Sequence, residues 1–543
     1  MKLFKGRQNF LYSAPSSSRV LCAAIFVLAL LLRFVHLFQI YQTPLLSVDY
    51  VPDTLPFLII AQKIIEGNFF YVIPMNMNVL YSFYLIPFIL LFQESVLAAT
   101  AVQLFIDALS ALLVYLIGRR IFDVRAGLLA AFIYAVYAPL IWFAGMPVGE
   151  SFCIFLLLLS FTFLIKALDC PDRGVYYYLA GFIGGLASLG RPNIILCSVL
   201  IISGIVFFNN PDKKKYSAAL RYILGIVFVL LPFSLNNYYL EKSLSPFPAK
   251  GGLNFYIGNH SGATGVYELI PGTSNKPYLY MYEAQDVASK NTGRELTAQE
   301  ADAYWYKRGL DDMASRPFDA LRLLLTKALL FINSQELATN LDYDFSKDFS
   351  SILKYFTIPP GLLMALALMG LLAIPHRDRK ALLLKLMFAG LMLSTVVFFI
   401  SDRYRIVSFP FVILLAAQYI FVLADFIRRR KKVMISLAVP ATIALTAIAS
   451  LPVHIFGIKT ENPTSFAHHQ YGIYLLSRNK IDEAVPEFQK AIRLNPLDPE
   501  PYFYLSCLWK HKKQYQQASE LKNAAEKLGY RGDSALIPNG ICD

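Results

Sequence analysis

The sequence predicts an all-α, polytopic membrane protein that ends in a polar helical domain. Of its 543 residues, 56% are hydrophobic and only 16% are charged, whereas ordinary soluble domains carry about 25% charged residues. The apolar residues gather in about eleven long runs up to residue 453, and a membrane-spanning helix needs roughly 20 mostly apolar residues. The segment 454–543 is polar and rich in helix-forming residues. We therefore expect two domains, 1–453 in the membrane and 454–543 in water.

Basic residues cluster between the apolar runs and not on one surface. The formal net charge of +13 would suit a nucleic-acid-binding protein, but clusters of this kind are typical of the positive-inside rule of membrane proteins, so we exclude nucleic acid as a partner. The predicted spans are Val20–Ile40, Leu97–Gly118, Ala126–Gly145, Ser151–Leu168, Val175–Leu189, Ile194–Phe208, Ala218–Leu235, Ser351–Ile374, Ala381–Ile400, Ile406–Ile427 and Val433–Val453.

The orientation follows from the first run and the basic clusters. The basic N-terminus precedes a run that is too long for a signal-peptide core and that lacks a small-residue cleavage site, which predicts an uncleaved anchor with a cytoplasmic N-terminus. The run Leu80–Phe92 is short and contains Pro87, so we interpret it as a re-entrant or interfacial helix. Leaving it out of the count places the basic clusters in the cytoplasm: Arg119–Arg120, Lys213–Lys215, Arg377–Lys380 and Arg428–Lys432.

Two long loops and the C-terminal domain then face outward from a plasma (inner) membrane. The loops cover about 41–96 and 236–350. In the C-terminal domain the small and bulky residues follow the tetratricopeptide spacing, with the generic helical hairpin as the alternative: Gly472, Ala484, Phe488, Ala491 and Pro496, then Ala518 and Ala525 one 34-residue period later. Two repeats seldom bury enough surface alone, so we expect them to dock on the membrane domain or on a protein partner. This domain contains Cys507 and Cys542, and the sequence does not decide whether they form a disulfide.

Three acids begin helices or loops on the predicted outer face. Asp49 and Asp53 open the first loop, and Glu150 lies at the outer end of an apolar stretch that has no further charge until Lys166. Ionisable groups at membrane depth usually face the bundle interior and mark function. The alternatives are a solvated loop acid for Asp49 or Asp53, and an acid stabilised by the helix dipole for Glu150.

Three arginines lie on the same face, against the positive-inside trend: Arg191, Arg403 and Arg405. Guanidinium groups at this depth suit a lipid-linked phosphate, which they bind through two hydrogen bonds; the alternative is snorkelling to head groups. The second loop adds a glycine-rich stretch that is a weak signal for sugar binding, with an irregular loop as the alternative. Its candidate residues, with one acid further along, are Lys250, Asn254, Tyr256, Asn259, His260 and Glu336. The sequence contains no phosphate-binding loop, dinucleotide fingerprint or zinc-ligand spacing.

In order and spacing, these motifs resemble the GT-C membrane glycosyltransferases. The nearest resemblance is to bacterial relatives of the protein O-mannosyltransferases of family 39 and of the aminoarabinose transferases, in the subgroup with tetratricopeptide tails. It runs from about Val20 to Ile427. The matching residues are Asp49, Leu80–Leu85, Gly118–Phe122, Gly149–Ser151, Gly190–Asn193, Gly251–Asn259, Gln335–Leu337 and Arg403–Arg405.

The resemblance implies an inverting transfer of a sugar from a polyprenyl-phosphate donor to an acceptor hydroxyl on the exoplasmic face. It assigns the catalytic role to Asp49, as general base, and a second acid to Glu150. Some members have two adjacent acids in the first loop, whereas Tyr50 follows Asp49 here, so a second-acid role of Asp53 is less well supported. Some members hold a divalent metal between two acids, a role open to Asp49 and Glu150. The chemistry agrees, because a hydroxyl nucleophile needs a base and a phosphate leaving group needs cations.

The acceptor and two other functions stay open. A protein, a lipid or a glycan would each supply the acceptor hydroxyl. A transporter or flippase for lipid-linked sugars is the first alternative, although transporters favour inverted repeats and charges at mid-membrane. The second alternative is a membrane anchor for a repeat scaffold.

Overall fold

Helices form most of the chain that the computed structural model describes, which is residues 16–47, 51, 53–68, 78–92, 96–208, 214–273, 280–339, 342–375, 378–458 and 461–530. In these residues the only β-pairing is one isolated bridge between Val266 and Ile400. The all-α prediction is therefore confirmed for the described part of the chain.

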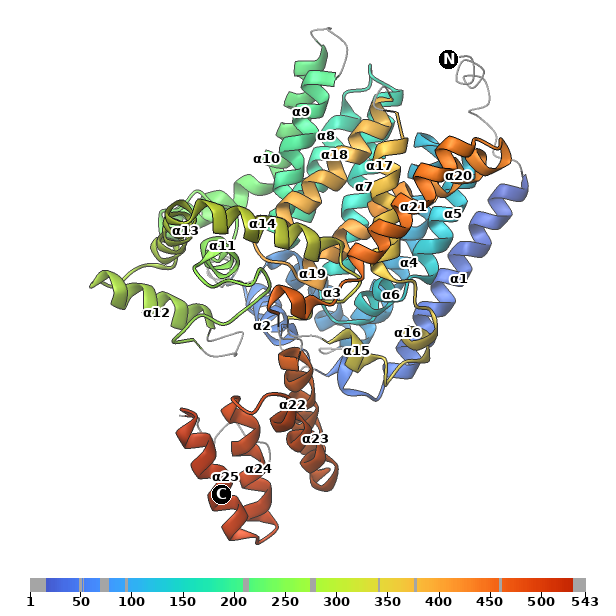
Figure 1. Ribbon diagram of the computed structural model, residues 1–543. Helices are drawn as coiled ribbons and strands as arrows, with labels where there is room; N and C mark the ends of the chain where they lie inside the picture. The colour runs from blue at the N-terminus through green and yellow to red at the C-terminus, as the bar shows by residue number, and fades with distance from the viewer. Residues whose placement is uncertain are drawn as a thin grey trace.

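A bundle of long apolar helices makes up the membrane part (Figure 1). Its helices are α1 (Ser16–Ile40), α4 (Val96–Ile121), α5 (Val124–Val136), α6 (Ala138–Gly145), α7 (Glu150–Asp169), α8 (Val175–Gly190), α9 (Ile195–Phe208), α10 (Lys214–Glu241), α17 (Pro360–Ala373), α18 (Arg379–Val396), α20 (Phe409–Arg428) and α21 (Lys432–Ala449).

Among the described residues, six helices are long and apolar enough to cross a membrane, or up to seven if the α5–α6 pair is one span bent by 54°. Other predicted spans fall on shorter apolar helices or, at α18, on a helix with three basic residues. The count of eleven spans therefore stays a prediction.

Proline accounts for the largest difference from the predicted spans. The prediction of one continuous span over 351–374 was wrong, because the structure has a short α16 (Ser351–Tyr355) and then a separate α17, which begins at Pro360. A proline is favoured in the first turn of a helix and cannot continue one from before it. The bend between α5 and α6 has the same origin, because Pro139 lacks the N–H that would bond the carbonyl of Ala135.

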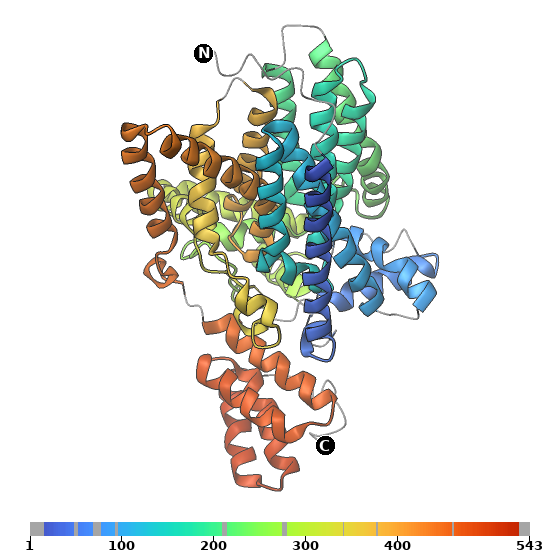
Figure 2. The same ribbon diagram turned by 90° about the vertical axis from the view of Figure 1, so that its right-hand side faces the viewer.

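The described residues of the basic clusters lie at one end of the bundle (Figure 1). Lys380 forms an ion pair with Asp169, and its ammonium donates to the Arg120 carbonyl at 3.5 Å. Figures 1 and 2 place the start of α1 at this end and the C-terminal domain at the other. The two predicted faces are thus at opposite ends of the molecule, while the direction across the membrane stays a prediction.

The two predicted outer loops are also helical where they are described. The first contains η1 (Pro44–Leu46), α2 (Thr54–Ile65) and α3 (Val79–Phe92). The second contains α11 (Gly251–Asn259), α12 (Tyr280–Thr292), α13 (Ala298–Ser315), α14 (Pro317–Ile332) and α15 (Tyr343–Ser346). The capping box of Thr297 and Glu300 begins α13. The second loop is tied to the bundle by the Ile400 N–H, which donates to the Gly265 carbonyl at 2.8 Å.

The C-terminal domain consists of two helical hairpins, α22 (Glu461–Ser477) with α23 (Ile481–Leu494) and α24 (Pro499–His511) with α25 (Tyr515–Lys527). The predicted small positions lie at the helix contacts: Ala484, Ala491 and Ala525 are fully buried, and a Cβ on Gly472 would lie 2.7 Å from the Phe488 ring. Whether these hairpins are tetratricopeptide repeats stays a prediction. Cys507 is disulfide-bonded, and Cys542 lies outside the described residues.

This domain docks on the membrane part through α22. The Tyr471 ring packs against Phe345 and Phe349, with centroids 5.8 and 5.5 Å apart. The Tyr474 hydroxyl donates to the Gln42 carbonyl at 3.2 Å, and the Thr464 hydroxyl donates to Asp342 at 2.7 Å. Contacts to both outer loops therefore fix the near hairpin.

Candidate functional site

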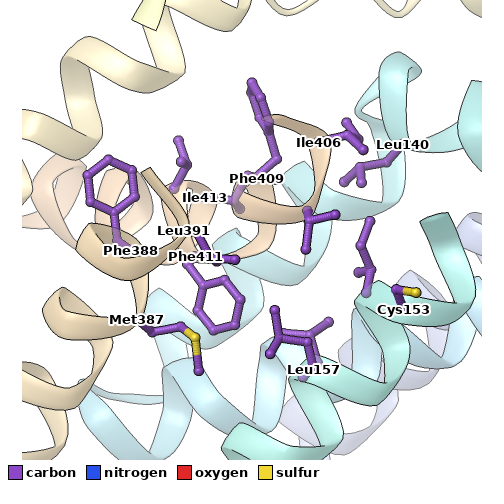
Figure 3. Close-up of a cluster of buried hydrophobic side chains, with 14 of the residues drawn as sticks. Leu140, Cys153, Leu157, Met387, Phe388, Leu391, Ile406, Phe409, Phe411 and Ile413 are labelled. Atoms are coloured by element: carbon purple, nitrogen blue, oxygen red, sulfur yellow. The ribbon is translucent and has the colours of Figure 1, made fainter. Parts of the chain in front are cut away.

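An apolar cluster between α7, α18 and α20 forms the base on which the candidate site stands (Figure 3). Phe161 of α7 packs edge to face against Phe411 of α20, with centroids 5.4 Å apart. Glu150 is the first residue of α7. Arg403 lies in α19 (Asp402–Arg405), which η4 (Ile406–Ser408) joins to α20. The packing therefore fixes the two helices that carry these charges.

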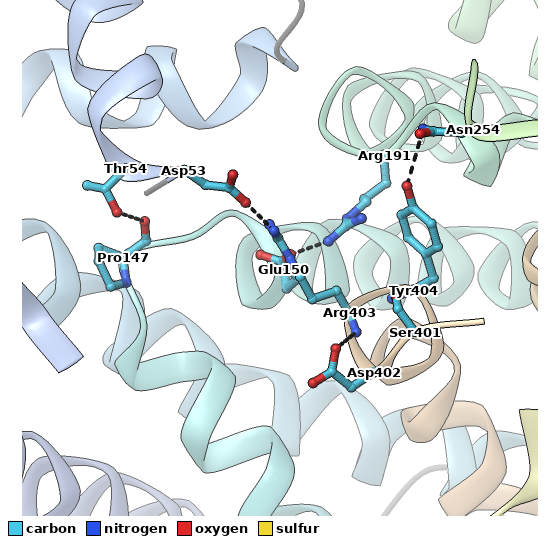
Figure 4. Close-up of polar contacts among 10 residues, drawn as sticks. All are labelled: Asp53, Thr54, Pro147, Glu150, Arg191, Asn254, Ser401, Asp402, Arg403 and Tyr404. Atoms are coloured by element: carbon cyan, nitrogen blue, oxygen red, sulfur yellow. Dashed lines mark hydrogen bonds and ion pairs between the residues drawn. The ribbon is translucent and has the colours of Figure 1, made fainter. Parts of the chain in front are cut away.

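Two arginines and two carboxylates form one buried network at this place (Figure 4). The Nε of Arg403 donates to Oε1 of Glu150 at 2.6 Å, and Arg191 donates to the same oxygen. Nη1 of Arg403 pairs with Asp53. The Glu150 side chain is 1% exposed and that of Arg403 is 15% exposed. The network joins residues predicted separately from four distant segments.

Local structure explains where each arginine points. Helix α8 ends at Gly190, because Pro192 disfavours a helical conformation at Arg191. The Arg191 guanidinium lies 5.0 Å from the centre of the Tyr404 ring. The Ser401 hydroxyl caps α19 by accepting the Tyr404 N–H at 3.3 Å. The Asp402 carboxylate accepts the N–H of Arg403 at 2.7 Å.

Polar side chains also fix the irregular segment before Glu150. Gln103 of α4 donates to the carbonyls of Ala144 and Met146 at 3.0 and 2.7 Å. Thr54 of α2 donates to the Pro147 carbonyl at 3.2 Å. These bonds satisfy buried carbonyls that no helix satisfies. They hold Glu150 at the N-terminus of α7, where the helix dipole favours a carboxylate.

The network borders a cavity of about 620 Å³, within the range of about 300–1,000 Å³ that is typical of small-molecule sites. Arg191, Arg403 and Lys250 line the cavity together with Asp53 and Glu150, and Asp302 is a third carboxylate of its described lining. Burial, aided by the charges of Arg191 and Arg403 and opposed by that of Asp53, lowers the pKa of Lys250 to about 8. The charges of the network therefore act on the pKa of Lys250.

A polar face of α13 also lines the cavity, and our sequence interpretation missed it. Gln299, Asp302 and Tyr306 line the cavity and are spaced i, i+3 and i+7, on one face of a helix. Asp302 accepts the Gly252 N–H at 2.6 Å, and burial raises the pKa of Asp302 to about 6. The helical spacing was a signal that was present in the sequence.

The predicted second-loop residues separate into two groups. Lys250 and Asn254 line the cavity, and the Asn254 amide donates to the Tyr404 hydroxyl at 3.5 Å. Tyr256 and His260 do not line it; the Tyr256 ring packs on Trp305 at 4.7 Å and on His260 at 5.2 Å. Asn259 also lies away from it.

Buried polar contacts explain the remaining predicted positions. The Asn259 amide donates to the Val397 carbonyl at 2.9 Å, and its oxygen accepts Lys327 at 2.9 Å. The fully buried Arg405 donates to the Asn333 carbonyl at 2.5 Å and to Glu336 at 2.7 Å. Neither Arg405 nor Glu336 lines the cavity. Asp49 lies outside the described residues.

The described residues do not fit a metal centre. They contain no group of three or more His, Cys, Asp or Glu side chains that would hold an ion. Glu150 also has two guanidiniums on one oxygen, and a divalent cation there would meet their repulsion. We derive no step through a metal.

Residues 79–239 match the family model described as dolichyl-phosphate-mannose-protein mannosyltransferase. The matched stretch contains Glu150 and Arg191 of the network. The match covers less than a third of the chain, all of it between α3 and α10. A search of curated proteins finds no match to the chain.

Among solved structures, the chain is similar to the oligosaccharyltransferase of Archaeoglobus fulgidus. Against its apo form the identity is 16% and the TM-score 0.44, over 85% of this chain and 59% of that one. Against the same enzyme, AglB, in complex with an inhibitory peptide and a dolichol-phosphate, the identity is 14% and the TM-score 0.45, over 86% and 60%. The chain therefore spans about three fifths of the length of these proteins.

Proposed function

We propose that this protein is a membrane glycosyltransferase that moves a sugar, with inversion, from a polyprenyl-phosphate donor to an acceptor hydroxyl in the cavity described above. The observation that carries the proposal is the buried network of Arg191, Glu150 and Arg403 on the wall of that cavity. The family match over residues 79–239 supports the same chemistry.

The cationic wall suits the phosphate of the donor. Guanidinium groups bind phosphate oxygens through paired, charge-assisted hydrogen bonds. As the sugar leaves, the phosphate gains charge, and fixed cations in a site with little water stabilise that charge. Arg191, Arg403 and Lys250 supply three such cations in the lining of the cavity. We propose that these three groups bind the donor phosphate.

Asp53 and Glu150 act through the arginines in this proposal. An ion-paired carboxylate has a reduced proton affinity, which makes it a weaker base. Their contacts instead hold the Arg403 and Arg191 guanidiniums in place, so we propose a positioning role for both. The general base remains Asp49, whose position in the sequence is four residues before the cavity-lining Asp53.

We place the reaction on the exoplasmic face. The basic clusters lie at the end of the bundle opposite to the C-terminal domain, as the positive-inside rule requires if that domain is outside. The disulfide bond of Cys507 supports the same placement, because disulfides persist in oxidising compartments. The C-terminal domain would then be available to a protein acceptor or partner, whereas a lipid or glycan acceptor needs no such domain.

Asp49→Asn tests the proposed base. Membranes that contain the wild-type chain should transfer label from a polyprenyl-phosphate sugar to an acceptor, and Asp49→Asn should reduce this transfer by about 10²- to 10⁴-fold, the usual contribution of a general base. Asp311→Asn, at an exposed acid of α13, is the control and should leave transfer unchanged. Full transfer by Asp49→Asn would remove Asp49 from the mechanism. Failure of the wild-type chain with mannosyl, glucosyl, galactosyl and aminoarabinosyl donors alike would refute the proposed function.

A further inference from the structure

The polar face of α13, formed by Gln299, Asp302 and Tyr306, has no role in the function proposed so far. It lines the same cavity as the arginine network and belongs to the second loop. Two of its three side chains have neutral polar groups, and the third is a carboxylate. This set differs from the cationic wall and suits a different part of a ligand.

We propose that this face binds the hydroxyl groups of the donor's sugar, with Asp302 and Tyr306 as the residues that contact it. The inference rests on the proposed function, since it divides the donor between the two walls: the phosphate on the arginines and the sugar on α13. It adds a recognition site to the reaction, and not a further catalytic group.

The chemistry of the two side chains fits sugar hydroxyls. A carboxylate offers about four lone-pair sites, and a phenol both donates and accepts. The backbone N–H groups of Gly252 and Leu253 donate to Asp302, which fixes the carboxylate and leaves it capacity for a ligand hydroxyl. Because burial raises the pKa of Asp302 only to about 6, the group is mostly ionised at neutral pH and accepts hydrogen bonds.

The backbone between the two walls keeps them close together. Lys250 feels the charges of Asp53, Arg191 and Arg403, and Gly252 bonds to Asp302. Two residues span at most about 7 Å. The α13 face therefore begins within a short distance of the cationic wall, in the same cavity, which favours the sugar attached to the phosphate over a separate acceptor.

Gly251 provides space for the Tyr306 hydroxyl. A Cβ at position 251 would lie 2.5 Å from that oxygen. The clash is with the tip of a side chain, so Gly251→Ala should displace the hydroxyl without breaking the backbone. It gives a second way to test Tyr306, besides Tyr306→Phe.

Binding measurements on the purified full chain separate this inference from the proposed function. The probes are a long-chain polyprenyl phosphate without sugar and its mannosyl, glucosyl, galactosyl and aminoarabinosyl derivatives. The wild-type chain should bind at least one derivative more tightly than the bare phosphate. Asp302→Asn, Tyr306→Phe and Gly251→Ala should each reduce this gain by about tenfold, the effect of one lost hydrogen bond to a charged or polar group. Their affinity for the bare phosphate should stay at the wild-type value.

Asp302→Asn retains an oxygen that accepts the Gly252 N–H at the start of α11. A loss of sugar-dependent affinity in this variant is therefore due to the lost charge and not to a lost hydrogen bond to α11. Asp311→Asn on the same helix is the control and should retain the whole gain. Equal losses for bare and sugar-bearing lipids would overturn the inference, as would a wild-type chain that binds every derivative no better than the bare phosphate. A wild-type chain that binds no polyprenyl phosphate at all would instead refute the proposed function.

Discussion

Replacing Arg403 with glutamine removes the group that joins both carboxylates of the network. Its side chain is 15% exposed and donates to Glu150 through Nε and to Asp53 through Nη1. Truncating one partner of a buried, hydrogen-bonded charge pair costs about 2–5 kcal/mol. Arg191 still pairs with Glu150 in the variant, so we expect about 2–4 kcal/mol in transition-state stabilisation, or a fall of about 30- to 1,000-fold in kcat/KM.

The assay is transfer of label from a polyprenyl-phosphate sugar, with thermal unfolding in detergent as the measure of folding. Arg403→Lys keeps the charge but not the planar fork that reaches two carboxylates, so it should recover stability before activity. Arg322→Gln, at an exposed arginine of α14, is the matched control and should change neither.

A double-mutant cycle sharpens the test. Combining Arg403→Gln with Glu150→Gln removes opposite charges together, so the combined loss of stability should be smaller than the sum of the single losses by about 1–3 kcal/mol. Activity should not return. Additive stabilities, or a single Arg403→Gln variant with wild-type kcat/KM, would refute the network as the core of the site.

Three further changes test other parts of the account. Burial lowers the pKa of Lys250 to about 8, so its ammonium loses a proton and kcat/KM should fall as the pH rises through about 8. Lys250→Arg should abolish this fall at alkaline pH. A flat pH profile of the wild-type kcat/KM would contradict the assignment. Arg405→Gln should lower the stability by about 3–5 kcal/mol, since it breaks the buried pair with Glu336, while the KM of the folded fraction stays unchanged; wild-type thermal unfolding would show that the pair is dispensable. Gln103→Leu should leave the Ala144 carbonyl without the Gln103 donor, at about 1–3 kcal/mol, while the Met146 carbonyl keeps the Val148 N–H. The variant should also lower kcat through misplacement of Glu150, and an unchanged kcat would remove Gln103 from the positioning of the site.

The helical class and the separation of the charged ends were predictable from the sequence. Long apolar runs indicate helices that are buried in lipid, and the basic clusters indicate which helix ends lie on the same side of the membrane. The breaks at Pro139 and Pro360 were less visible, because hydropathy averages over a kink. A count of spans needs helix lengths, which composition does not give.

For the site, the sequence indicated which residues carry unusual charges but not which of them meet. Arg403 and Arg405 are two positions apart and looked equivalent, yet one lines the cavity while the other is fully buried beside Glu336. Tertiary packing of α19 decides between them. The polar face of α13 was missed because Gln299, Asp302 and Tyr306 are ordinary residues for an amphipathic helix, and only the fold turns them toward the cavity.

The central claim is that the cavity binds a lipid-linked phosphate through its arginines. Its most direct test compares the affinity of the purified chain for a polyprenyl phosphate and for the corresponding polyprenyl alcohol. The account predicts tighter binding of the phosphate by at least about tenfold, the effect of one charge-assisted contact, and loss of this preference in Arg191→Gln and Arg403→Gln. Equal affinity for phosphate and alcohol, or an undiminished preference in both variants, would contradict it.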